Sequence, residues 1–226
     1  MRVRDPVARI AEELSPESRR RRLSLYVALG DSFTAGVGCP RGEAWPERLV
    51  AGLQSEHPGL ELRNLAVRGA TSADVLVQLD EAVELEPDLV TVVCGANDVL
   101  QSTRPDPDRY AGHLATILSR LRGSVLGGRV VTATSPERWE FLELRPRTRA
   151  RVERGIASFN TVTRRLASIF EVPCLEVSGH PGLTLADNFD ADGLHPSTLG
   201  HRHAARAFAA LLESSYGIQS DPGRDR

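Results

Sequence analysis

Short runs rich in β-branched and aliphatic residues alternate with longer amphipathic stretches from Leu23 onward, and this alternation constrains the fold more than any other feature. It is typical of repeated strand-helix units around a mainly parallel sheet. Between Leu89 and Val93 every residue except one threonine is apolar, as expected for a strand covered on both faces. We therefore predict an α/β domain with five strands, at residues 23–30, 60–67, 89–95, 129–134 and 174–177.

Two amphipathic helices complete the predicted framework. Apolar residues recur at spacings of three and four between residues 147 and 170, and again from about 198 to 216, so both helices should pack on the sheet. The length of 226 residues suits one such domain. We place it at residues 23–217, preceded by an arginine-rich extension at 1–22, a helix or arm, and followed by a flexible tail at 218–226.

Charge and cysteine content exclude several classes of protein. The chain has 28 Lys and Arg against 30 Asp and Glu, a formal net charge of -2, so nothing points to nucleic acid as a partner. The three cysteines Cys39, Cys94 and Cys174 form no C-x-x-C pair, which argues against a disulfide framework or a zinc site. No apolar run approaches the ~18 residues of a membrane span, and residues 1–22 lack the apolar core of a signal peptide. We expect a cytoplasmic protein.

A serine and a histidine stand where nucleophilic chemistry needs them. Ser32 follows the first predicted strand directly, on a tight turn that faces the ligand-binding edge of a parallel sheet. A serine hydroxyl needs a base within hydrogen-bond reach to attack at neutral pH. His195 lies in a loop that enters the last helix, and Asp192 three residues earlier is placed to orient its imidazole. Taken alone, this Asp-x-x-His loop is also compatible with a histidine on the surface.

Two further positions offer hydrogen-bond donors to a developing negative charge. Asn97 follows the strand at 89–95, where its side-chain amide can point into the same cleft. Gly69 follows the strand at 60–67, where a glycine allows a backbone N–H to approach closely. Each of these positions, taken singly, is also compatible with an ordinary turn.

Taken together, these blocks resemble a known family. Gly30-Asp31-Ser32, Gly69, Gly95-x-Asn97-Asp98 and Asp192-x-x-His195 occur in the order and strand contexts of the SGNH, or GDSL, hydrolases. The resemblance implies a flavodoxin-like three-layer α/β/α sandwich with no metal or organic cofactor. It also implies site roles: Ser32 as nucleophile and oxyanion donor, Gly69 and Asn97 as further oxyanion donors, His195 as base, and Asp192 as its partner.

The reaction expected from this set is hydrolysis of a carboxylic ester through an acyl-enzyme, on a small or single-chain acyl substrate. One alternative is transfer of the same acyl group to a sugar or metabolite hydroxyl, and another is an inactive ligand-binding domain of the same fold. A nucleotide-binding domain is disfavoured because the chain has no G-x-G-x-x-G or P-loop motif. The oligomeric state stays open, and a monomer is compatible with the sequence.

Four neighbouring residues are open to more than one interpretation. Trp139 and Phe141 lie on a loop at the ligand-binding edge and either line a substrate pocket or pack against the following helix. Asp31 and Asp98 flank Ser32 and Asn97, and turn hydrogen bonds explain them better than a direct catalytic role. We expect a small-molecule ester as the partner, with no nucleic acid and no membrane span.

Overall fold

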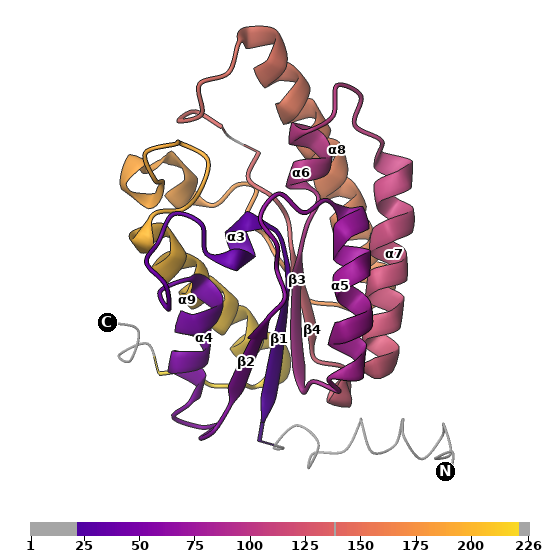
Figure 1. Cartoon of the computed structure of the whole chain (residues 1–226), viewed down its shortest axis with the longest axis vertical. Coiled ribbons are helices and arrows are strands. Elements are labelled where there is room, and N and C mark those ends of the chain that lie inside the picture. Colours follow the sequence, from indigo (N-terminus) through magenta and orange to yellow (C-terminus); the bar gives the residue numbers. More distant parts are fainter. Residues whose placement is uncertain (1–21, 138, 222–226) are drawn as a thin grey trace.

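The computed structural model describes residues 22–137 and 139–221. Its five strands form one parallel sheet in the order β2-β1-β3-β4-β5 (Figure 1). The strands are β1 (Leu25–Gly30), β2 (Glu61–Asn64), β3 (Leu89–Val93), β4 (Val130–Ala133) and β5 (Cys174–Leu175). This confirms the predicted α/β fold with a five-stranded sheet, and the strand order is that of flavodoxin-like proteins.

Helices cover both faces of the sheet and make the three layers. The helices are α3 (Ser32–Ala35), α4 (Trp45–Leu53), α5 (Ser72–Glu84), α6 (Ala96–Leu100), α7 (Pro107–Ser124), α8 (Pro146–Ile169) and α9 (Thr198–Tyr216), with short 3-10 turns η1 (Leu126–Gly128), η2 (Pro181–Thr184) and η3 (Ala186–Asn188). Helices α5, α7 and α8 lie on one face and α4 and α9 on the other (Figure 1).

Alternation along the buried strands supplies the two halves of the core. In β1, Val27 and Leu29 face the α5, α7 and α8 layer, whereas Tyr26 and Ala28 face α4 and α9. Successive side chains of a strand point to opposite faces, so a strand that is apolar throughout suits a sheet covered on both sides. The nearly apolar run at residues 89–93 is explained in the same way, because β3 is covered on both faces and all five of its residues are buried.

Several strands are shorter than the sequence predicts. The fifth strand is expected to reach residue 177, but β5 ends at Leu175 because the Val177 N–H donates to the Thr134 hydroxyl at 2.8 Å. A hydrogen bond to a side chain thus takes the place of the next backbone hydrogen bond of the sheet. The first strand begins at Leu25 instead of 23, since the N–H of Ser24 donates to the Asp88 carboxylate at 2.7 Å.

The terminal segments differ from expectation at one end. The sequence predicts a flexible tail from residue 218, but Ile218 is only 4% exposed and packs into the α4 and α9 side of the core. The Asp221 N–H also donates to the Gly52 carbonyl at 2.8 Å. Apolar burial and this bond hold the segment against α4. The proposed extension at 1–22 lies, apart from Arg22, outside the described residues, as do residues 222–226.

Within the described ranges, none of the helices is both long and apolar enough to cross a membrane.

Candidate active site

The sheet order brings two loops together at its carboxyl edge. From β1 the chain moves to β2 on one side and then returns to place β3 on the other. The carboxyl ends of β1 and β3 are therefore the switch point, outside which such folds bind ligands. Ser32 begins α3 directly after β1, and Asn97 lies in α6 after β3. Gly30 permits this close pairing, because a Cβ there would lie 2.6 Å from the Val93 carbonyl oxygen.

The turn that carries Ser32 is held by its neighbour. Asp31 caps α3 by accepting a hydrogen bond from the Phe33 N–H at 3.0 Å, so Ser32 occupies the first helical position. Ser32 is half-buried and lines a cavity at the sheet edge. A rigid strand below and a capped turn above therefore fix the hydroxyl in place.

Ser32, His195 and Asp192 form one chain of hydrogen bonds. The Ser32 Oγ lies 2.9 Å from His195 Nε2, and His195 Nδ1 lies 2.6 Å from Asp192 Oδ2. An ionised carboxylate only accepts, so in the neutral imidazole Nδ1 carries the proton and Nε2 is left to accept from the serine hydroxyl. In that tautomer the nitrogen that faces Ser32 is the one that can take its proton.

Asp192 is built to stay ionised. Partial burial opposes ionisation, but the side-chain and backbone bonds from His195 and the N–H of Leu194 prevail and lower the pKa of Asp192. Asp192 Oδ1 accepts both backbone N–H groups at 2.9 Å. Gly193 makes the turn possible, because its φ is +66° and any other residue would place its Cβ only 1.9 Å from the Phe141 carbonyl oxygen.

Asn97 is joined by a hydrogen bond to the segment that carries Gly69. The Asn97 Nδ2 donates to the Ala70 carbonyl at 3.1 Å and to Asp31 Oδ2 at 3.3 Å. For the N–H groups of Ser32 and Gly69, no acceptor is found among the residues that the structure describes. Asn97 lines the same cavity as Ser32, and Gly69 is the residue before Ala70, whose carbonyl accepts the bond from Asn97.

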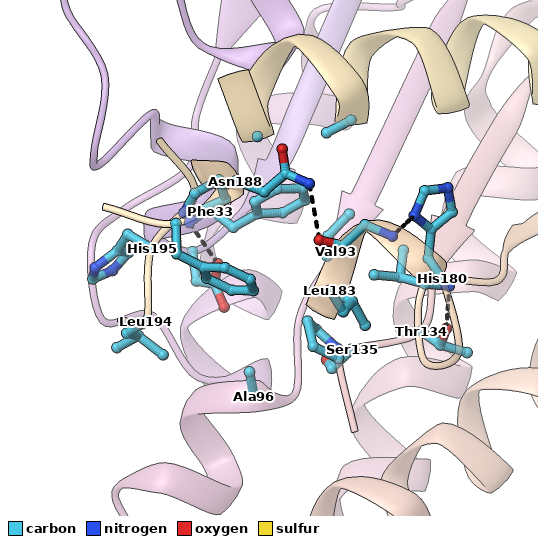
Figure 2. A pocket seen from close by; sticks show the side chains of 18 of the residues that line it. Phe33, Val93, Ala96, Thr134, Ser135, His180, Leu183, Asn188, Leu194 and His195 are labelled. Carbon is cyan, nitrogen blue, oxygen red and sulfur yellow. Dashed lines mark hydrogen bonds between the residues drawn. The ribbon is translucent and has the colours of Figure 1, made fainter. Parts of the chain in front are cut away.

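A mostly apolar cavity of about 170 Å³ opens beside Ser32 and His195. Figure 2 shows its wall between Phe33, His195 and Leu194 at one end and Thr134, Ser135 and His180 at the other. Trp139 belongs to this wall and is 5% exposed. Phe141 is not among the lining residues; its ring packs against Phe189, which does line the cavity, with ring centroids 5.0 Å apart.

Much of the wall comes from residues that the sequence analysis did not single out. They lie on the irregular segment between β5 and α9: His180, Gly182, Leu183, Asn188 and Phe189. Asn188 holds the segment together by donating to the Gly182 carbonyl at 2.8 Å (Figure 2). Short 3-10 turns have no apolar periodicity, so the sequence carried no signal for them.

The remaining polar neighbours serve the framework. Asp98 accepts bonds from the backbone and hydroxyl of Ser72 at 2.8 and 2.5 Å. His201 is fully buried, bonded to the Trp45 N–H and the Val37 carbonyl, and burial lowers its pKa. In the described part of the chain, no three His, Cys, Asp or Glu side chains are arranged to hold a metal ion.

The raised pKa of Asp31 predicts that the stability of the fold depends on pH. Burial raises the pKa of this carboxyl to about 6, whereas the unfolded chain has a value of ~3.9. The folded protein binds this proton more tightly, so its stability falls as pH rises between these values. The neutral variant Asp31→Asn avoids this cost, and its stability relative to wild type should rise by about 2 kcal/mol from pH 4 to pH 7. Urea unfolding at both pH values measures the difference, and a pH-independent difference would contradict it.

Comparison with known proteins identifies similar chains. The model of the GDSL-like lipase/acylhydrolase family matches residues 28–203. An arylesterase of Vibrio mimicus is 30% identical over 99 residues, which are 43% of this chain and 48% of that protein. The chain thus spans half or less of the length of the curated relatives it matches.

Two solved structures share the fold. The structure of TesA has a TM-score of 0.68 and 22% identity, covering 84% of this chain and 98% of that one. Axe2, an acetylxylan esterase from Geobacillus stearothermophilus, has a TM-score of 0.66 and 22% identity, covering 85% of this chain and 95% of that one. At these identities the likeness concerns the fold.

Proposed function

The chain belongs to the GDSL-like lipase/acylhydrolase family of carboxylic ester hydrolases, and on that premise we propose that it cleaves small, single-chain acyl esters with Ser32 as nucleophile. The observation that carries this proposal is the hydrogen-bond chain from Ser32 through His195 to Asp192, at 2.9 and 2.6 Å, beside an apolar cavity. Nucleophile, base and orienting carboxylate within hydrogen-bond reach are what acyl transfer to serine requires.

The proposed reaction proceeds in two halves. Ser32 Oγ attacks the ester carbonyl while His195 Nε2 takes its proton and then passes that proton to the departing alcohol. Water next attacks the acyl-enzyme, with His195 again accepting and returning the proton, which releases the acid and restores Ser32. Asp192 stabilises the imidazolium in both halves.

Negative charge develops on the carbonyl oxygen in each half, and three donors are available to it. They are the N–H groups of Ser32 and Gly69 and the side-chain amide of Asn97. Each such donor typically contributes about 10²–10³ in kcat. No metal or organic cofactor takes part in this proposal, and the cytoplasmic location stays a prediction.

The acyl group is assigned to the cavity beside Ser32. Phe33, Leu183 and Leu194 are among its lining side chains, which favour an apolar chain over a charged one. Its volume is about 170 Å³. We infer a short acyl chain, well below palmitoyl in length, since each buried CH₂ contributes about 0.8 kcal/mol only while it stays inside the cavity.

A chain-length series tests this function. The purified protein should hydrolyse p-nitrophenyl esters, with kcat/KM rising from acetyl to an optimum at a chain well shorter than palmitoyl and then falling. Chelator should leave the rates unchanged. Product analysis with a competing alcohol separates hydrolysis, which yields free acid, from acyl transfer, which yields a new ester. A highest kcat/KM on the palmitoyl ester would show that this cavity is not the acyl site.

A further inference from the structure

Helix α6 contacts one short segment of the chain, Gly69–Ser72, at three points. Gln101, the C-terminal cap of α6, donates from Nε2 to the Gly69 carbonyl at 2.7 Å. Asn97 donates to the Ala70 carbonyl at 3.1 Å, and Asp98 accepts from the backbone N–H and the hydroxyl of Ser72. Nearly every residue of the segment is therefore joined to the same turn of helix.

The two partners in this arrangement carry two of the proposed oxyanion donors. The segment holds the N–H of Gly69, and the helix holds the side-chain amide of Asn97. Gly69 has a φ of +80°, which glycine adopts readily, and a glycine has more accessible backbone conformations than any other residue, so its peptide needs a restraint to stay in one of them. The bond from Gln101 to the Gly69 carbonyl supplies such a restraint.

The other two contacts restrain positions beyond Gly69. Ser72 is fully buried at the start of α5, so Asp98 fixes the far end of the segment as part of the framework. Val67 holds the near end through its N–H, which donates to the Gly30 carbonyl at 3.1 Å. Gln101 contacts the glycine itself, and its side chain is exposed, so it can be changed without opening the core.

We propose that Gln101 is a positioning residue that orients the Gly69 peptide so that the Gly69 N–H and the Asn97 amide converge on the same oxygen. This inference rests on the proposed function. Gln101 does not touch the reacting atoms; it acts through Gly69. Its contribution belongs to the transition state, because the oxyanion forms only there, and kcat should therefore change while KM stays nearly constant.

The variant Gln101→Met keeps the length of the side chain and removes the donor. We expect kcat to fall about 10-fold with KM within about 3-fold of wild type, since a small misplacement of an oxyanion donor forfeits part of its effect. Gln101→Lys restores a donor and should recover most of the loss. Phenylboronic acid, which mimics the tetrahedral intermediate on Ser32, should bind Gln101→Met about 10-fold more weakly, in parallel with kcat.

A matched control is available in α4. Gln54 is likewise an exposed C-terminal cap whose Nε2 donates to a backbone carbonyl, that of Leu60 at 3.5 Å. Gln54→Met should leave kcat, KM and phenylboronic acid affinity unchanged.

The outcomes separate this inference from the proposed function. A wild type with no Ser32-dependent ester hydrolysis would overturn both. An active wild type with Gln101→Met at full kcat and full phenylboronic acid affinity would overturn the inference alone. So would a variant in which only KM rises, or a loss that Gln101→Lys fails to recover.

Discussion

Replacing Ser32 with alanine is expected to lower kcat on the best p-nitrophenyl ester by about 10⁴-fold or more, because the nucleophile of the proposed acyl-enzyme is gone. The oxyanion donors and the cavity remain, so a residual rate above that in water should persist. The fold should be unchanged, since Ser32 is half-buried, its side-chain bond is to His195, and both residues line the cavity.

The measurement is initial-rate kinetics on wild type and Ser32→Ala, with thermal unfolding as a check on folding. Ser135→Ala is a suitable control, because Ser135 lines the same cavity and pairs with the Asn160 side chain through its backbone, which the substitution keeps. Full activity in Ser32→Ala would remove Ser32 from the mechanism. An equal loss of kcat in Ser135→Ala would point to a general effect of substitution on the cavity.

Replacing His195 with alanine should cost about 10⁴–10⁶ in kcat, since Ser32 then loses the acceptor that lies 2.9 Å from its hydroxyl. His195 is 7% exposed and borders the cavity, so the substitution leaves an imidazole-sized space beside Asp192. Added imidazole is expected to enter this space and restore part of the rate, with Asp192 holding it in the orientation that the native ring has.

Kinetics with and without imidazole test this expectation. His180→Ala provides the control, because His180 lines the same cavity but bonds to the Gly182 N–H instead of Ser32. That variant should change kcat by less than about 10-fold, as expected for a contact outside the transition state. A loss below about 10-fold in His195→Ala would mean that another group serves as the base. The double variant Ser32→Ala with His195→Ala should have a kcat no lower than that of Ser32→Ala alone, because the two residues act as a unit.

The sequence alone determined the class of fold, because burial patterns are local. A run such as Leu89–Val93 reads as a strand covered on both faces whatever its neighbours are, and helices α8 and α9 follow from apolar spacing alone. Family motifs also lie in short contiguous blocks, so the order of residues along the chain is enough to identify Ser32, Asn97, Asp192 and His195 as candidates.

Tertiary structure decided what surrounds these residues. Phe141 is a candidate for the pocket wall by its position in the sequence, yet it packs on Phe189, while Trp139 lies in the wall itself. Ile218 falls in the predicted flexible tail, yet it is buried against the core. Each outcome depends on contacts between segments that are distant in the chain, and such contacts leave no periodic pattern in the sequence.

The division between the two sources has one physical reason. Strand and helix periods appear within a few neighbouring positions, so the sequence by itself determined the α/β fold. The motif residues lie in short contiguous blocks, so the sequence also identified the candidate nucleophile, base and orienting carboxylate. The 2.9 Å approach of Ser32 to His195 spans 163 positions, and the contact of Gln101 with Gly69 spans 32. Only the tertiary structure, through the switch point between β1 and β3 and the irregular segments around it, decided these contacts and the shape of the cavity.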